Sequence, residues 1–305
     1  MNIEMLDTDT IYRQMLDTAD AAEREALYRD ALLAPFAGMF RAMGGGDALA
    51  MARGWALYGP DDCAGGAREH IIAMLDHLSA ADSWERTAEA AERARAAFAP
   101  HAARIPLERI TAALVLTDPA RGTALDRGYS GFGGIPGYVM TTYSAADDYT
   151  LPRVGGATVH EINHNVRFAL FPFNPMTVTV GAYSVAEGLA EAFAAELYGE
   201  EVVGYYVTDI SEDDLATARR VIAGALDQTG FNTIRSYIFG DAISAQMGRP
   251  ALGVPNFAGY ATGYRAVRQY LARTGKSVAE ATFVPADEII AESGYFTLSN
   301  EMANG

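Results

Sequence analysis

Two histidines four positions apart, His160 and His164, carry the clearest chemical signal in the chain, with Glu161 directly after the first. Positions four apart lie on the same face of an α-helix, so both imidazoles can reach one metal ion. Glu161 lies one position round the helix, which lets its carboxylate face a metal-bound water rather than the metal. The flanking residues from Ala157 to Val166 are uncharged and include no proline. Burying three polar groups on such a helix is costly unless a metal compensates them. A chance match to this short pattern is the alternative.

A third ligand is available on the segment Ser184–Gly199, where Glu187 and Glu191 are again four positions apart. On a helix, one carboxylate can bind the metal while the other accepts a hydrogen bond from a ligand histidine and fixes its tautomer. We expect Glu187 to be the ligand and Glu191 its outer support, with Gly188 allowing the two helices to approach closely. Two histidines and one glutamate leave an open coordination position, which is typical of a catalytic zinc site. In the alternative interpretation, Ser184 and Glu187 form a capping box at a helix N-terminus and Glu191 is solvated.

The surrounding sequence predicts the helices that these residues require. Residues 1 to 104 are rich in good helix formers, and paired glycines and a Gly-Pro break them into separate helices. The apolar run Ile110–Leu116 predicts a strand, and a glycine-rich stretch leads into a second strand from Tyr138. The expected fold is α+β and predominantly helical, with a helical N-terminal region at 1–104 and a second domain at 105–305. The helices expected to matter most for the site cover Ala157–Leu170, Ser184–Tyr198 and Ala258–Arg273.

The composition argues against several other classes of protein. The chain has 305 residues, and 23 Lys and Arg against 39 Asp and Glu give a net charge of −16. Such an acidic balance argues against nucleic acid or an anionic membrane as the partner. A single cysteine, Cys63, rules out an intrachain disulfide and a thiolate metal cluster. The segment from Met1 to Asp20 is polar, and no apolar run approaches the ~20 residues that span a bilayer. We therefore expect a cytoplasmic protein without a membrane segment.

Three motifs follow one another along the chain: HEINHNVR, then EGLAE followed by ELYG, then AGYATGYRAVRQYL. In type, order and spacing they resemble the bacterial family of predicted zinc-dependent proteases of the gluzincin type, over roughly residues 105 to 295. The resemblance implies a zincin-like fold, in which an active-site helix and a glutamate-bearing helix accompany a small, mostly antiparallel sheet whose edge strand borders the cleft. It also implies zinc as the cofactor, one ion per chain, and a peptide or protein as the substrate.

The chemistry of such a site predicts a mechanism. Zinc held by His160, His164 and Glu187 would lower the pKa of a bound water toward ~7. Glu161 would then take the proton of that water and deliver it to the leaving amine.

A hydrogen-bond donor opposite the zinc is also needed to stabilise the tetrahedral intermediate. Tyr260 and Tyr264 lie four positions apart on one expected helix, with Gly259 and Gly263 giving close backbone access. We expect Tyr260 to assist catalysis, because the segment that resembles the family begins with Gly-Tyr there, and Tyr264 to contact substrate. An aromatic core stripe is the alternative for both tyrosines.

The glycine-rich stretch Gly131–Gly137 lacks phosphate-loop spacing, contains no lysine and precedes no helix directly. A better hypothesis is an edge strand and loop that pair with an extended peptide backbone. Gly134, Gly137 and Tyr138 are then candidate substrate-binding residues. A turn-rich hairpin without a binding role is the alternative.

Together these patterns predict a zinc-dependent metallopeptidase in which a glutamate general base and a metal-activated water hydrolyse peptide bonds. Two other interpretations stay open. One is a catalytically inactive helical protein-binding module on a zincin scaffold, which metal content and turnover would identify. The other is a zinc hydrolase of a non-peptide amide, which only a substrate screen would identify.

Overall fold

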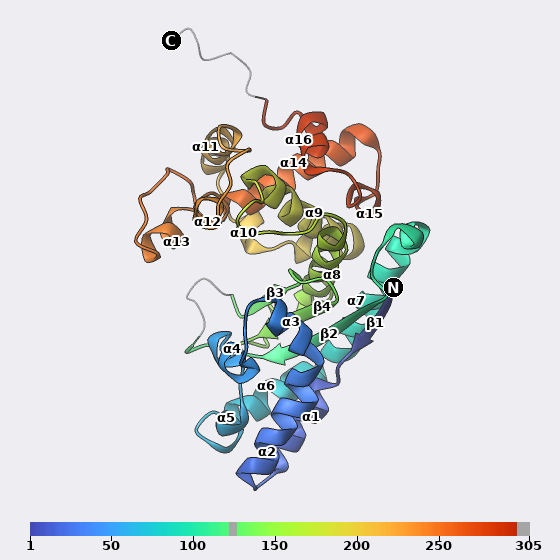
Figure 1. The fold of residues 1–305 in the computed structure, drawn as a ribbon, viewed down its shortest axis with the longest axis vertical. Helices are drawn as coiled ribbons and strands as arrows, with labels where there is room; N and C mark the ends of the chain where they lie inside the picture. Colours follow the sequence, from blue (N-terminus) through green and yellow to red (C-terminus); the bar gives the residue numbers. More distant parts are fainter. Residues whose placement is uncertain (122–126, 298–305) are drawn as a thin grey trace. The chain divides into compact units, whose positions relative to one another are not determined.

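The computed structural model describes residues 1–121 and 127–297 (Figure 1). The chain forms two compact units, Met1–Ala169 and Leu170–Gly305. Among the described residues, the first unit holds the whole sheet and the second is helical. No helix in these ranges is long and apolar enough to cross a bilayer.

The first unit consists mainly of helices that pack around a four-stranded sheet. Asp7 caps the first helix by accepting a hydrogen bond from the Thr10 N–H, which is the usual role of an acidic N-cap. The apolar residues of these helices join those of the sheet in one buried core. The helices are α1 (Thr8–Asp17), α2 (Ala21–Leu27), a π-helix (Tyr28–Leu33), α3 (Ala37–Ala42), α4 (Ala48–Gly54), α5 (Pro60–Ala64), α6 (Arg68–Ala80), α7 (Ser83–Phe98) and α8 (Val154–Leu170), with short 3₁₀ turns between some of them.

The sheet has the strand order β1-β2-β4-β3. β1 pairs with β2 and β2 with β4 in parallel, and β3 pairs with β4 antiparallel. The expectation of a mostly antiparallel sheet is therefore wrong. The physical reason lies in β2, which is buried almost throughout from Ile110 to Leu116, because a central parallel strand is covered on both faces and shows a continuous apolar run. The strands are β1 (Asn2–Met5), β2 (Arg109–Leu116), β3 (Tyr129–Phe132) and β4 (Tyr138–Tyr143).

The N-terminal region is not purely helical, because it begins with β1. This strand lies beside β2 at one edge of the sheet, with Asn2 opposite Arg109 and Met5 opposite Ala112 (Figure 1). It has only four residues, and none of them is fully buried, so the sequence offers little signal for it. The region 1–104 thus contributes β1 to the sheet. A domain boundary near residue 104 stays a prediction.

The two faces of the sheet carry different neighbours. Phe132 of β3 packs its ring 5.1 Å from the ring of Trp55, which directly follows α4. Gly131, the preceding residue of the strand, faces the other way, because side chains alternate between the faces of a sheet. A Cβ placed on Gly131 would meet Glu161 of α8. The N-terminal helices therefore cover one face of β3, and α8 covers the other.

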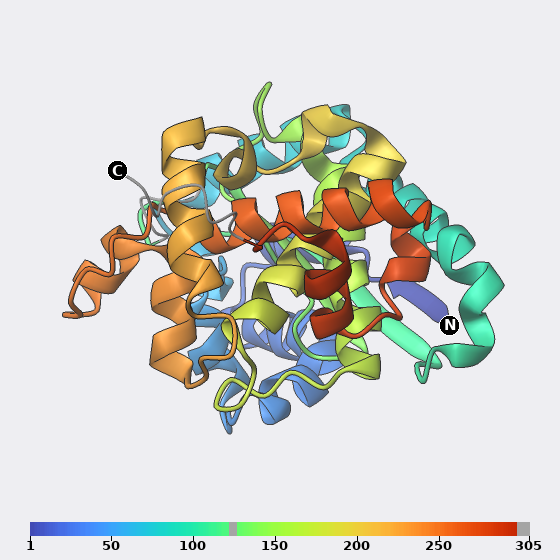
Figure 2. The same cartoon turned by 90° about the horizontal axis from the view of Figure 1, so that it is seen from above.

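The second unit is built around two long helices, α9 and α14, which pack against each other at glycines. A Cβ on Gly188 would lie 2.3 Å from the carbonyl of Gly263, and a Cβ on Gly263 would lie 1.9 Å from the backbone of Ser184. The close approach that Gly188 permits is thus with α14, which also contacts α11 and α16 (Figure 2). The helices are α9 (Val180–Tyr198), α10 (Tyr205–Thr208), α11 (Glu212–Ala223), α12 (Phe231–Phe239), α13 (Asp241–Gln246), α14 (Ala258–Thr274), α15 (Val278–Ala281) and α16 (Ala286–Ser293).

Candidate metal centre

Helix α8 carries the two histidines and the glutamate between them. It spans Val154–Leu170 and so begins three residues before the expected start at Ala157. Nearly every residue from Val154 to Phe168 is buried, which makes it a core helix. The side chains of the cluster are part of this buried surface: His160 is 7% exposed, Glu161 8% and His164 5%.

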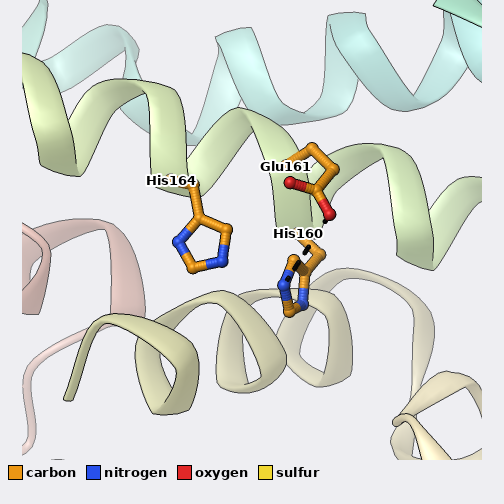
Figure 3. Close-up of side chains that lie close together, drawn as sticks. All are labelled: His160, Glu161 and His164. Atoms are coloured by element: carbon orange, nitrogen blue, oxygen red, sulfur yellow. Dashed lines mark ion pairs between the residues drawn. The ribbon is translucent and has the colours of Figure 1, made fainter. Parts of the chain in front are cut away.

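The three side chains lie within reach of one ion. One ligand atom of His160, of Glu161 and of His164 can be chosen so that all lie within 4.8 Å of one another. The two imidazoles extend from the same side of α8, with ring centroids 4.7 Å apart, and Glu161 Oε1 lies 3.9 Å from His160 Nε2 (Figure 3). Phe168 stacks on the ring of His164 at 5.2 Å and an angle of 6°. The four-residue spacing on α8 thus places both histidines on one face, and the stacking contact supports the ring of His164.

The donor set of this cluster fits zinc. Imidazole nitrogens and carboxylate oxygens are the ligands of catalytic zinc sites, and soft thiolates are not required. Burial of two imidazoles and a carboxylate on one helix face is costly without compensation, and a divalent cation bound between them would supply it.

Asn165, on the same helix, fastens the glycine-rich loop to α8. Its side chain is fully buried. The amide Nδ2 donates to the carbonyls of Gly133 at 2.9 Å, Ile135 at 3.3 Å and Tyr138 at 2.6 Å. Its Oδ1 accepts a hydrogen bond from the Gly137 N–H at 2.6 Å. Sequence reasoning missed this residue. The available signal was a polar amide side chain on an otherwise apolar helix. It comes after a glycine-rich loop whose backbone N–H and C=O groups need hydrogen-bond partners.

Two glycines of this loop lie directly against Glu161. A Cβ on Gly131 would lie 2.2 Å from Glu161 Oε1, and a Cβ on Gly133 would lie 2.2 Å from the Glu161 carbonyl oxygen. Any side chain at either position would displace the glutamate or the helix. Gly137 has φ +95°, which a side chain rarely permits. The glycines are therefore needed for a close approach and a turn beside the cluster, whereas substrate binding by Gly134, Gly137 and Tyr138 stays a prediction.

The outer edge of β3 presents backbone groups beside Glu161. The Ser144 N–H donates to the Gly128 carbonyl at 2.9 Å, just beyond the β3–β4 ladder. Hydrogen-bonded pairs alternate along an antiparallel ladder, so Ser130 and Phe132 turn their N–H and C=O groups toward β4. The N–H and C=O of Gly131 then point away from β4. Because β3 is the last strand of the sheet among the described residues, these groups lie at its edge.

In the second unit, Glu187 lies in the middle of α9 rather than at its start. The helix begins at Val180, and Thr179 caps it by accepting a hydrogen bond from the Ala182 N–H at 3.0 Å. The alternative of a capping box formed by Ser184 and Glu187 is therefore wrong. Glu187 is 5% exposed, and a mid-helix carboxylate at that depth requires a compensating partner.

Glu191, one turn after Glu187, is 2% exposed, so the solvated alternative is wrong for it. Its Oε2 accepts a hydrogen bond from the Gly204 N–H at 2.9 Å, and its Oε1 accepts one from the Tyr206 hydroxyl at 2.5 Å. These contacts hold α9 to the start of α10. A hydrogen bond from a ligand histidine to Glu191 stays a prediction.

The two tyrosines of α14 have different surroundings within the second unit. The ring of Tyr260 lies 4.8 Å from that of Tyr206, in a cluster that includes Phe239 and Phe257. The Tyr264 hydroxyl donates to the Glu200 carboxylate. Burial and then this hydrogen bond raise the pKa of Tyr264. The catalytic role of Tyr260 and the substrate contact of Tyr264 stay predictions.

Comparison with known proteins adds two findings. The sequence model of the family described as "Predicted Zn-dependent protease (DUF2268)" matches residues 83–291. A protein of Bacillus subtilis (strain 168) with the name "Uncharacterized protein YjfC" is 34% identical over 307 residues, which covers 97% of this chain and 100% of the relative. No solved structure matches. The family match includes α8, the glycine-rich loop, α9 and α14, and it leaves out residues 1–82 and 292–305.

Proposed function

The chain belongs to the family of predicted zinc-dependent proteases, and from this membership we propose that it is a zinc-dependent metallopeptidase. The observation that carries the proposal is the buried cluster of His160, Glu161 and His164 on α8, whose ligand atoms come within 4.8 Å of one another. Two imidazoles on one helical face and an adjacent glutamate are the arrangement that metalloproteases use.

In this proposal Glu187 completes the ligand set as the third protein ligand. Its support is that a buried carboxylate occupies the middle of α9, one turn before Glu191, which is itself held by a backbone N–H and a tyrosine hydroxyl. A fixed Glu191 would give the preceding turn of α9, which carries Glu187, a defined orientation. With His160 and His164, the set has one carboxylate and two imidazoles and leaves a position open for catalysis.

Glu161 is the proposed general base. When bound, the zinc ion supplies a Lewis acid that polarises the substrate carbonyl and makes water more acidic. Glu161 accepts a proton from the attacking water at a carboxylate oxygen and then delivers it to the nitrogen of the leaving amine. The backbones of Gly131 and Gly133 pack against this glutamate, which limits the positions that its carboxylate can take. The Tyr260 hydroxyl is the proposed donor to the developing oxyanion.

The substrate in this proposal is an extended peptide that adds to the edge of β3. The N–H and C=O of Gly131 point away from β4 and lie on the residue that contacts Glu161. Pairing of a peptide with this edge would bring its backbone beside the proposed base, by strand addition. Gly134, Gly137 and Tyr138 would shape the adjoining loop, which Asn165 holds in place.

The test compares the wild-type protein with Glu161→Gln on a mixture of unstructured proteins and peptides, with products identified by mass spectrometry. We expect cleavage by the wild type, a loss of about 10²- to 10⁴-fold in Glu161→Gln, and equal zinc content in both. The exposed Glu89→Gln on α7 is the matched control and keeps the wild-type rate. Turnover by Glu161→Gln within threefold of the wild type would remove Glu161 from the mechanism. Zinc binding without cleavage of any peptide would favour a binding module or a non-peptide hydrolase.

A further inference from the structure

A cavity of about 370 Å³ lies within the first unit, beside β3. Its walls combine segments far apart in sequence. Met43 and Trp55 come from the N-terminal helical region, Asp118 follows β2, Ser130 and Phe132 belong to β3, and Thr142 belongs to β4. By comparison, a cavity of ~150 Å³ lined by apolar side chains can hold a benzene molecule. The space is thus large enough for an amino-acid side chain of any size.

The cavity lies on the face of the sheet opposite to Glu161. Ser130 and Thr142 are partners in the β3–β4 ladder, so their side chains share one face with Phe132. Gly131, between Ser130 and Phe132, has its Cβ direction toward Glu161 on the other face. The same short strand therefore borders the proposed catalytic glutamate on one side and the cavity on the other.

This arrangement has a consequence for any peptide that pairs with the edge of β3. Successive side chains of an extended chain point to opposite faces. When one side chain of the peptide is directed toward α8, its neighbours are directed toward the face that carries Ser130 and Phe132. We propose that the cavity receives a side chain of the substrate, from a residue within about two positions of the cleaved bond.

The chemistry of the walls selects a large apolar or aromatic side chain. The rings of Trp55 and Phe132 lie 5.1 Å apart, and Met43 is an exposed hydrophobic residue at 38%. The carboxylate of Asp118 does not make the cavity selective for cations, because it accepts hydrogen bonds from Arg121 and from the Ala120 N–H, each within 2.9 Å. Aromatic and thioether walls favour apolar partners and aromatic rings in particular.

Backbone strain supports a functional role for this region. Ala56, which also lines the cavity, has φ +59°. A left-handed conformation of an alanine is uncommon and is maintained only when its surroundings demand it. The Ala56 carbonyl accepts a hydrogen bond from the Asp118 N–H at 2.8 Å, and this contact ties the helical wall to the end of β2. Residues 43–56 lie outside the range 83–291 that the family model matches, whereas the other walls of the cavity lie within it.

The inference rests on the proposed function. Its test uses internally quenched decapeptides that differ from one another at a single position, which holds Phe, Leu or Gly. The varied position is, in turn, each of the two residues before and the two residues after the cleaved bond. We expect the wild type to have a kcat/KM about 10- to 100-fold higher for Phe or Leu than for Gly at one of these positions, since burial of a large apolar side chain supplies a factor of this size. Ser130→Phe places a ring in the cavity and should reduce this ratio to about threefold or less. Met43→Trp narrows the cavity from the wall formed by the N-terminal helical region. It serves as the second variant if Ser130→Phe does not fold. Glu89→Phe, an exposed residue of α7, is the control and should keep the wild-type ratio.

Binding of unquenched peptides of the same sequences, each with a single fluorophore, to Glu161→Gln is measured by fluorescence anisotropy and separates this inference from the proposed function. Cleavage by the wild type with a Phe preference that the cavity variants abolish supports both. Cleavage without that preference, or with a preference unchanged in both cavity variants, overturns the cavity as a subsite and leaves the peptidase intact. A third outcome is that no peptide is cleaved, that Phe peptides bind more tightly than Gly peptides, and that Ser130→Phe abolishes this difference in binding. This outcome overturns the peptidase and supports the cavity.

Discussion

Replacement of Asn165 by alanine should detach the glycine-rich loop from α8, and the size of the effect follows from the hydrogen bonds that are lost. An amide side chain can donate two full hydrogen bonds, and here three backbone carbonyls share them, while its oxygen accepts one from the Gly137 N–H. At ~1 kcal/mol for each of about three hydrogen bonds, and ~1 kcal/mol more for a buried N–H without an acceptor, we expect the free energy of unfolding to fall by about 4 kcal/mol. Domains have about 5–15 kcal/mol available, so Asn165→Ala should still fold.

The assay combines urea denaturation, hydrogen exchange of the segment 133–138, zinc content and peptidase rate. Asn165→Ala should show the lower stability, fast exchange at Gly137 and a reduced rate with zinc retained, because Gly131 and Gly133 of this loop lie against Glu161, the proposed base. Asn174→Ala removes a single exposed hydrogen bond, to the Met176 N–H, and is the matched control with a loss below ~1 kcal/mol. If the unfolding free energy of Asn165→Ala stayed within ~1 kcal/mol of the wild type and exchange at Gly137 remained slow, the proposed role of this amide would be wrong.

Three further predictions concern local packing. Gly131→Ala places a Cβ 2.2 Å from Glu161 Oε1 and should lower kcat at least about tenfold with zinc content unchanged; an unchanged kcat would show that the glutamate does not need this contact. Gly188→Ala should lower the unfolding free energy by about 1–3 kcal/mol, because its Cβ meets the backbone of α14 at 2.3 Å. Gly54→Ala has open space around the new Cβ and should not destabilise the protein. Equal melting temperatures of the two variants would contradict this packing. Burial raises the pKa of the Cys63 thiol to about 11, so at pH 8 its reaction with a disulfide reagent should be at least about 100-fold slower in the folded protein than in urea, and similar rates would show that the thiol is accessible.

The sequence predicted those parts of the molecule that depend on local pattern. The helix with the two histidines, the helix with Glu187 and Glu191, and α14 occur where helical spacing and good helix formers indicated them, with ends that differ by a few residues. The strands at Ile110–Leu116 and from Tyr138 also occur as expected. These elements are set mainly by contacts between residues close in sequence, which periodicity reports directly.

The parts that sequence reasoning missed depend on contacts between distant segments. β1 has four residues and pairs with a strand more than 100 positions away, so its own composition carries little signal. The parallel pairing of β2 has a local signal in its nearly continuous apolar run from Ile110 to Leu116, but such a run can also belong to a buried helix or a sandwich strand. Asn165 accepts a hydrogen bond from a loop residue 28 positions earlier. The cavity likewise needs side chains from positions 43 to 144 in one place, and no local pattern reveals it.

Metal content is the most direct test of the central claim, that His160, His164 and Glu187 hold one catalytic zinc ion. It should be measured by mass spectrometry of the purified protein, beside Glu187→Ala and beside Glu196→Ala, which removes an exposed carboxylate from the same helix. We predict about one zinc per chain in the wild type and in Glu196→Ala, and loss or strong weakening of binding in Glu187→Ala. Unchanged zinc in Glu187→Ala would assign the third ligand to another residue, and no zinc in the wild type even after its addition would contradict the account.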